Sequence, residues 1–281
     1  MTYDCIIIGA GPAGVAAAVH MKRTGLNIVL IEKKNIGGLL RNANLIENYL
    51  GFPEGISGKR FAGCLRRHLQ RLRIPLIREE VTTIRKRKRF IVQTEQRSYS
   101  CRHVIIATGT VPKKAGIPGE ASLEGKKIFY EISDMPESRT KKTIVVIGGG
   151  DVAFDYALQL SERGHMPIIF TKGKIRCLPI LRERAKRKGI RYMERCCPKR
   201  VRESGKRIEV LCSSGRLMAD CMLVATGRKR HYPRIMTASR KGLHFAGAAR
   251  DRRYRYAHIA AGDALRAAAN VIHASLHPPL L

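Results

Sequence analysis

Two glycine-rich turns, each between a short apolar run and a helical pattern, constrain this chain of 281 residues more than any other feature. The first reads Gly9-Ala10-Gly11-Pro12-Ala13-Gly14 and the second reads Gly148-Gly149-Gly150-Asp151-Val152-Ala153. In this context the glycines let backbone amides approach a dinucleotide pyrophosphate at a helix N-terminus. Each turn is followed far downstream by Ala-Thr-Gly, at 107–109 and 225–227. The predicted fold class is therefore α/β, with two Rossmann-like dinucleotide-binding domains.

The first turn is predicted to lie inside one βαβ unit. Strands are expected at residues 3–8 and 26–32, with a helix from about Ala13 to Thr24 between them. Glu32 closes the second strand, 23 residues after Gly9. An acidic side chain at this place accepts hydrogen bonds from both hydroxyls of an adenosine ribose, and it disfavours a 2′-phosphate.

A second βαβ unit is predicted around the second turn, with a strand at 143–147, a helix through Leu160 to Arg163 and a strand at 167–171. The second of these strands ends without an acid, and Lys172, Lys174 and Arg176 follow it. Cations at this place attract a 2′-phosphate. The other expected elements are a basic helix near 57–72, alternating strands at 81–106, an exposed linker at 117–120, and strands near 208–212 and 221–225.

The composition is strongly basic, with 54 lysines and arginines against 22 acidic residues and a formal net charge of +32. This balance favours an anionic partner, which could be nucleic acid, membrane lipid or an acidic protein. The basic runs are dispersed over many segments, and no single recognition helix stands out. A solvated basic surface, reflecting the amino-acid usage of the organism, explains the same charge at least as well.

The eight cysteines show neither zinc-finger spacing nor a Cys-x-x-Cys pair, so no metal site and no redox dithiol of that type is predicted. The adjacent pair Cys196-Cys197 is interpreted as two partly buried small residues at a strand end. Scattered reduced cysteines fit a cytoplasmic protein. The longest apolar stretch, residues 5–19, contains the first glycine turn, so it is not expected to span a membrane and the protein is expected to be soluble.

Together these motifs resemble the low-molecular-weight thioredoxin reductase family. The resemblance rests on GAGPAG, Glu32, GGLL at 37–40, IENYLGFP at 46–53, both Ala-Thr-Gly turns, GGGDVA and the closing segment from Phe245, and it covers nearly the whole chain. It implies an FAD domain of residues 1–112 and 229–281, with an NADPH domain of residues 113–228 inserted between them. It also implies a homodimer.

The resemblance assigns roles to single residues. Gly9, Gly11 and Gly14 would serve FAD, Asn48 would lie close to the flavin ring, and Gly38, Leu39, Thr108 and Gly109 would line the FAD site. The second turn, Gly148 to Val152, would hold NADPH with Lys172 and Arg176. The remaining cofactor-binding predictions are Pro12, Ala13, Glu32, Val81, Gly149, Gly150, Asp151, Gly227 and Gly247. No catalytic residue and no metal ligand is predicted.

The sequence departs from the family where the redox-active Cys-x-x-Cys is expected. Glu131 and Asp134 stand there, 17 and 14 residues before Gly148. A carboxylate cannot exchange disulfides, so reduction of thioredoxin by the usual route is not expected. Glu131 is either a proton donor beside the flavin or a polar residue tolerated after loss of the dithiol.

The C-terminal segment departs from the family as well. Ala248 replaces an aspartate that binds the ribityl chain of FAD in the family, and Tyr256 stands where glutamine is common. FAD is then expected to bind loosely, unless Asp251 compensates after a local shift.

The expected function is an FAD-dependent oxidoreductase that takes electrons from NADPH and passes them to something other than an internal dithiol. A quinone, a small acceptor and an acidic carrier such as ferredoxin or flavodoxin all remain open. One alternative is a degenerate flavin- or nucleotide-binding protein whose basic surface binds nucleic acid or anionic lipid. Another is a disulfide reductase that uses the scattered cysteines.

Overall fold

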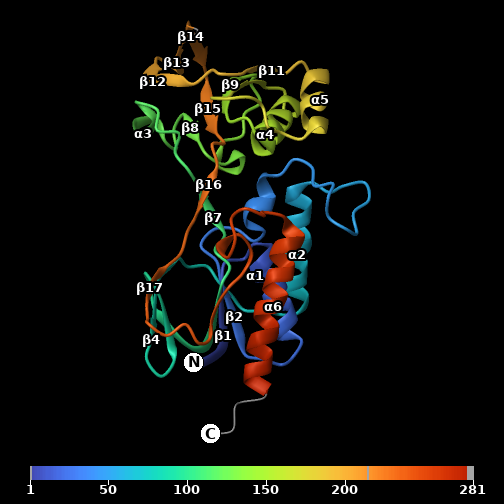
Figure 1. Cartoon of the computed structure of the whole chain (residues 1–281), viewed down its shortest axis with the longest axis vertical. Coiled ribbons are helices and arrows are strands. Elements are labelled where there is room, and N and C mark those ends of the chain that lie inside the picture. The colour runs from blue at the N-terminus through green and yellow to red at the C-terminus, as the bar shows by residue number, and fades with distance from the viewer. Residues whose placement is uncertain (1, 214, 277–281) are drawn as a thin grey trace. The chain divides into compact units, whose positions relative to one another are not determined.

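The structure is a computed structural model that describes residues 2–213 and 215–276. The chain forms two compact units, which Figure 1 shows with the elements labelled. Unit 1 consists of Met1–Arg41, Glu47–Val111 and Lys229–Leu281, and unit 2 consists of Asn42–Ile46 and Pro112–Arg228. A two-stranded sheet of β7 (Thr110–Pro112) and β16 (Arg228–Arg230) contains two of the four passages of the chain from one unit to the other, after Val111 and after Arg228.

Unit 1 is built on a sheet whose centre is parallel. β1 (Thr2–Ile8) pairs in parallel with β2 (Ile28–Ile31) on one side and β6 (Ser98–Ile106) on the other. The sheet continues through β3 (Leu76–Ile77) beyond β2, and through the antiparallel strands β5 (Phe90–Thr94) and β4 (Val81–Lys86) beyond β6. The short strands β17 (Arg234–Met236) and β18 (Leu243–Phe245) pair in parallel with β4 and β6.

Helices α1 (Pro12–Lys22) and α6 (Ala257–Leu276) pack side by side in unit 1, as Figure 1 shows, and α2 (Gly58–Arg71) packs against α1. Their contact is lined with small buried residues, among them Ala17, Ala18, Ala264 and Ala268, which let the helix backbones approach closely. Cys5–Ile8 of β1 are all buried, as expected for a central parallel strand covered on both faces. The one-turn helices η1 (Gly38–Asn42) and η3 (Gly247–Ala249) complete the helical elements of this part of the chain.

Unit 2 contains a parallel sheet in the order β11 (Arg191–Met193), β10 (Met166–Phe170), β9 (Thr143–Ile147), β15 (Cys221–Val224) and β8 (Ile128–Phe129). Helix α4 (Asp151–Glu162) connects β9 to β10, and α5 (Pro179–Arg187) follows β10. The antiparallel strands β12 (Pro198–Ser204), β13 (Arg207–Cys212) and β14 (Gly215–Ala219) form a separate small sheet. Short helices α3 (Glu120–Leu123) and η2 (Ile132–Asp134) lie on either side of β8 in the chain.

The predicted α/β class is confirmed, and both predicted βαβ units are present. The strand predicted at 143–147 is β9, the helix predicted from about Ala13 to Thr24 is α1, and the helix predicted near 57–72 is α2. Both glycine turns join a buried parallel strand to the helix that follows it.

The exposed linker predicted at 117–120 is wrong at its two ends. Pro118 and Gly119 are exposed, but Ile117 lies in the core of unit 2 and Glu120 is 4% exposed. The segment is held by β12, because the amide of Val201 donates to the carbonyl of Pro118 at 2.9 Å, and a Cβ at Gly119 (φ +91°) would overlap the carbonyl oxygen of Val201. The prediction for the adjacent cysteines is also corrected: Cys196 is buried, whereas Cys197 is exposed.

The buried carboxylate of Glu120 organises this turn. It accepts hydrogen bonds from the amides of Ala115 (2.9 Å), Gly116 (2.7 Å) and Ile117 (3.0 Å), and from the Tyr130 hydroxyl (2.7 Å). Burial alone would raise the pKa of Glu120, but these hydrogen bonds together lower it. The ionised carboxylate is therefore part of the folded structure of unit 2.

We predict that Glu120→Gln lowers the free energy of unfolding by about 1–3 kcal/mol at neutral pH, because buried donors lose a charged acceptor. A lowered pKa stabilises the fold above the usual value of 4.5, and this stabilisation is lost as the pH falls below it. Urea unfolding followed by circular dichroism should show a difference from wild type that shrinks below pH 4.5. The control Glu124→Gln removes only an exposed ion pair with Lys114 and should have little effect. Equal effects of the two substitutions would contradict the role of Glu120.

Candidate functional site

The backbone of the first glycine turn packs so closely against its neighbours that two of its residues must be glycine. Gly9 has φ +102°, and a Cβ there would lie 2.5 Å from the carbonyl oxygen of Ala107. A Cβ at Gly14 would overlap the carbonyl oxygen of Gly9. The amides of Gly9 and Ala107 donate to the carbonyls of Ile31 and Ile8, each at 2.8 Å, so the turn begins where the parallel strands end.

Gly11 has a different environment, because a Cβ there would meet nothing within 4 Å. It is the N-cap of α1, its side chain cannot cap the helix, and Pro12 occupies the first helical position. The amides at this helix N-terminus and the helix dipole favour an anion in the open space. This cradle fits the pyrophosphate of a dinucleotide.

Glu32 reaches the same turn from the end of β2. Its Oε2 accepts from the amide of Ala10 at 2.6 Å, and its Oε1 accepts from the amide of Lys34 at 2.7 Å. Each carboxylate oxygen has a further lone pair with which it can accept from a ribose hydroxyl. The position of Glu32 therefore suits the role that the sequence predicts for it.

Two further predicted residues lie beside the first turn. A Cβ at Gly38 would come within 3.4 Å of Cα of Gly11, and a Cβ at Gly247 (φ +61°) would come within 3.1 Å of Cβ of Ala13 and 3.2 Å of Cβ of Ala260. The amide of Gly37 donates to the carbonyl of Ala10 at 2.8 Å and ties this loop to the turn. Thr108 Oγ1 donates to the carbonyl of His231 at 2.6 Å, Gly109 has φ +66°, and Leu39 is 37% exposed.

The structure does not bring every predicted residue to this turn. The side chain of Val81 is buried at the start of β4, in the core cluster that does not include α1. Asn48 is exposed, in the segment between η1 and α2.

The second glycine turn repeats the arrangement of the first. Gly148 has φ +150°, and a Cβ there would lie 2.6 Å from the carbonyl oxygen of Ala225. Its amide donates to the carbonyl of Phe170, and the amide of Ala225 donates to the carbonyl of Ile147. Gly150 caps α4 and has open space where a Cβ would be, as Gly11 does before α1. In both turns the alanine of the downstream Ala-Thr-Gly covers the first glycine.

The segment after β10 folds back onto the second turn. The amide of Arg176 donates to the carbonyl of Gly149 at 2.7 Å, and the amide of Leu178 donates to Oδ1 of Asp151 at 2.8 Å. A Cβ at Gly149 would overlap Oγ1 of Thr171. Lys172, Lys174 and Arg176 are exposed, and so is Val152, while Gly227 has φ +111° in the adjoining Ala-Thr-Gly. Cations thus border an open helix N-terminus.

Glu131 is held by a network inside unit 2. Its Oε2 accepts from Asn42 Nδ2 at 2.6 Å and from the Tyr156 hydroxyl at 3.0 Å, and its Oε1 accepts from the Arg228 guanidinium at 2.6 Å. Burial and the charge of Glu131 raise the pKa of Tyr156. Three donors, one of them the guanidinium of an ion pair, occupy both carboxylate oxygens, which favours a structural role for Glu131 over that of a proton donor. Sequence analysis missed Asn42, Tyr156 and Arg228 because no local pattern marks them.

Ala248 and Asp251 lie at η3, beside Gly247. The carboxylate of Asp251 accepts from the Arg253 guanidinium at 2.7 Å and from the Arg253 amide at 2.9 Å. These hydrogen bonds lower the pKa of Asp251 to about 2. Because Asp251 is already paired, the structure does not support its predicted compensation for Ala248.

Within the described residues, no three histidine, cysteine or acidic side chains are grouped so that they could hold a metal ion. Nor does that part of the chain contain a helix with the length and apolar character needed to cross a membrane.

Comparison with known proteins places these features in a family. Residues 3–263 match the family model described as pyridine nucleotide-disulphide oxidoreductase. Among curated relatives, thioredoxin reductase of Treponema pallidum is 41% identical over 162 residues, which cover 57% of this chain and 52% of the relative. Thioredoxin reductase of Bacillus subtilis is 35% identical over 186 residues, covering 65% of this chain and 58% of the relative. The chain thus spans a little over half the length of these relatives.

Solved structures match over nearly the full length. Lactococcus lactis thioredoxin reductase superimposes with a TM-score of 0.86 at 26% identity, covering 96% of this chain and 97% of that structure. Thioredoxin reductase of T. acidophilum superimposes with a TM-score of 0.84 at 25% identity, covering 98% and 99%.

We predict that Gly14→Ala destabilises the fold and that Gly11→Ala does not. The Cβ of Gly14→Ala would overlap backbone atoms of Gly9 and should lower the thermal unfolding temperature markedly, whereas the Cβ of Gly11→Ala would enter open space and should not. Thermal unfolding without added nucleotide, followed by circular dichroism, compares them. Equal destabilisation by the two substitutions would contradict the described packing of the first turn.

Proposed function

The chain belongs to the pyridine nucleotide-disulphide oxidoreductase family, and from this premise we propose that it is an FAD-dependent reductase supplied with electrons by NADPH. Two open, uncapped helix N-termini behind glycine turns are the observation that carries the proposal. When bound, FAD supplies the redox chemistry by taking up the hydride of NADPH. The residues of this chain bind and orient the two dinucleotides.

We assign FAD to the first turn. Gly11 leaves room for the pyrophosphate, Glu32 offers free lone pairs to ribose hydroxyls, and Gly38 and Gly247 lie beside the turn without side chains. The assignment of Asn48 and Val81 to FAD binding stays a prediction from the resemblance alone. Ala248 gives the ribityl chain no carboxylate acceptor. The loss of one hydrogen bond to a charged acceptor weakens FAD binding by about 1.5–3 kcal/mol relative to family members that have it.

We assign NADPH to the second turn. The open space at Gly150 suits a pyrophosphate, and the backbone of Arg176 is fixed against Gly149. The exposed cations Lys172 and Arg176 supply the charge that a 2′-phosphate requires. No acidic residue ends β10, whereas Glu32 follows β2 at the first turn. This difference supports NADPH at the second turn and FAD at the first.

Electrons leave this protein without an internal dithiol. No two of its eight cysteines are separated by two residues. Glu131 and Asp134 stand at the two positions where the resemblance predicts the cysteines of the redox dithiol. Glu131 is held in an ion pair with Arg228 and takes no part in disulfide exchange. The acceptor must therefore receive its electrons from the flavin directly.

The acceptor that the surface favours is an acidic electron carrier. With a net charge of +32, the protein attracts a negatively charged partner at long range and raises the rate of encounter. An acceptor of this class needs no thiol, since bound flavin would supply one-electron chemistry without one. A quinone or another small acceptor would gain nothing from the charge.

We predict that anaerobic mixing of the FAD-loaded protein with NADPH bleaches the visible absorption of oxidised flavin. Bleaching should be slower with NADH, because the cations near Gly149 contribute only when a 2′-phosphate is present. In the same preparation, NADPH with thioredoxin should give no reduction of insulin. Flavin that stays oxidised in excess NADPH would refute the proposed electron donor, and rapid insulin reduction would refute the absence of a dithiol route.

A further inference from the structure

A cavity of about 380 Å³ lies in unit 1, lined by residues of β18 and α6 and by Arg250, which follows η3. Its volume lies within the range of small-molecule sites. Residues 243–245 of β18 and Ala267 of α6 line one side of it, and Arg250, Arg266 and Asn270 give it a polar rim. The lining therefore combines an apolar side with a charged and polar rim.

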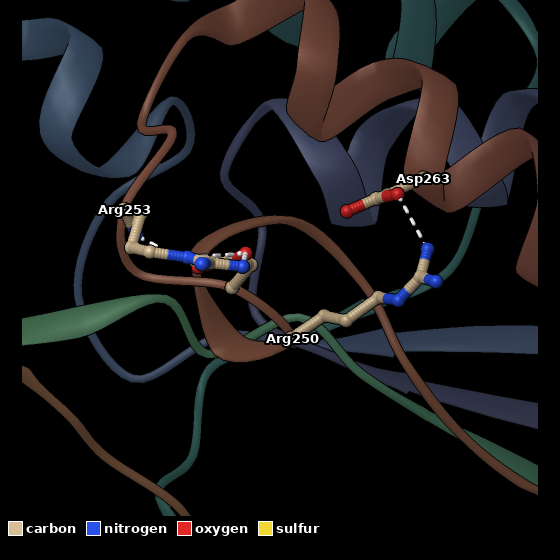
Figure 2. A network of polar contacts seen from close by, with 4 residues as sticks. Arg250, Arg253 and Asp263 are labelled. Carbon is tan, nitrogen blue, oxygen red and sulfur yellow. Dashed lines mark hydrogen bonds and ion pairs between the residues drawn. The ribbon is translucent and has the colours of Figure 1, made fainter.

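Two arginines in the rim are oriented by one buried carboxylate. Asp263, which is 8% exposed, accepts at Oδ1 from the guanidinium of Arg250 at 2.7 Å and from that of Arg266 at 2.6 Å. Figure 2 shows Arg250 extended from the loop after η3 to Asp263 on α6. The guanidinium groups use one N–H each in these bonds, and their side chains stay 49% and 70% exposed. The carboxylate thus holds two forks of donors in place while leaving most of their donors available.

His244 of β18 also borders the cavity. Burial lowers the pKa of His244, so the ring is neutral at pH 7 and the polar groups around the cavity sum to one positive charge.

We propose that this cavity binds a small organic anion, with its carboxylate or phosphate between Arg250 and Arg266 and its apolar part against β18. A carboxylate or a phosphate can accept two parallel hydrogen bonds from one guanidinium group, which a lysine ammonium does not offer. The orienting carboxylate of Asp263 sets the two guanidinium groups before the ligand arrives, which reduces the entropy lost on binding. None of the lining residues is among those assigned above to FAD or NADPH, and the inference does not depend on the proposed function.

The test uses benzoate and phenyl phosphate as probes, titrated by isothermal calorimetry into protein saturated with FAD and NADP⁺, so that neither probe occupies a pyrophosphate site. Arg266→Ala should weaken the binding of the probe roughly tenfold or more, because a charge-assisted hydrogen bond is lost. Asn270→Asp should weaken it as well, since it adds a negative charge to the rim without removing any contact of Asp263. The matched control is Arg253→Ala, which also removes an exposed arginine paired with an aspartate, but outside the cavity.

Saturable binding that falls in Arg266→Ala and Asn270→Asp but stays within about twofold of wild type in Arg253→Ala supports the site. The probe that binds more tightly then identifies the head group as carboxylate or phosphate. Equal losses in Arg266→Ala and Arg253→Ala would show that the general positive charge attracts the probes, and would overturn the proposal. Absence of saturable binding of both probes to the wild-type protein would overturn it as well.

Discussion

Each glycine turn depends on a close approach between its first residue and a strand end that is distant in the sequence. Gly9 lies against the carbonyl of Ala107, and Gly148 lies against the carbonyl of Ala225, so a Cβ on either glycine would enter backbone atoms. The amides of Ala107 and Ala225 in turn donate to the strands that precede the turns. This contact places the N-termini of α1 and α4 at the carboxyl ends of the parallel strands. The uncapped amides at Gly11 and Gly150, on which the proposed binding of two dinucleotides rests, follow from that placement.

Much of the fold is readable from the sequence because it is encoded by local patterns. The strand at 143–147 and the helix after Gly11 are predicted correctly, since apolar β-branched runs and glycine turns specify them within a few residues. The burial of Ile117 and Glu120 is missed because the segment is held by β12, more than eighty residues later, through the contacts of Pro118 and Gly119 with Val201. A glycine and a proline indicate a turn but do not tell whether the turn is covered.

The candidate site, like the fold, is predictable from the sequence only in part. Glu32 is predictable, because its distance from Gly9 is fixed by one βαβ unit. The partners of Glu131 are not, because Asn42, Tyr156 and Arg228 come from three separate segments. The ion pairs of Asp251 and Asp263 are not predictable either, because the chain has many arginines and only the tertiary structure selects the partner. Asp251 pairs with Arg253, and Asp263 pairs with Arg250 and Arg266. The replacement of a dithiol by Glu131 and Asp134 is visible in the sequence alone, and the structure adds the ion pair that occupies the first of these positions.

The central claim is that bound flavin is the only redox centre of this protein. Anaerobic reductive titration of the FAD-loaded protein with dithionite tests it most directly, because a flavin and a redox-active disulfide each take up an electron pair. The account predicts uptake of one electron pair per bound FAD, with complete bleaching at that point. Uptake of a second pair per FAD would reveal a redox-active disulfide among the eight cysteines and would contradict the account.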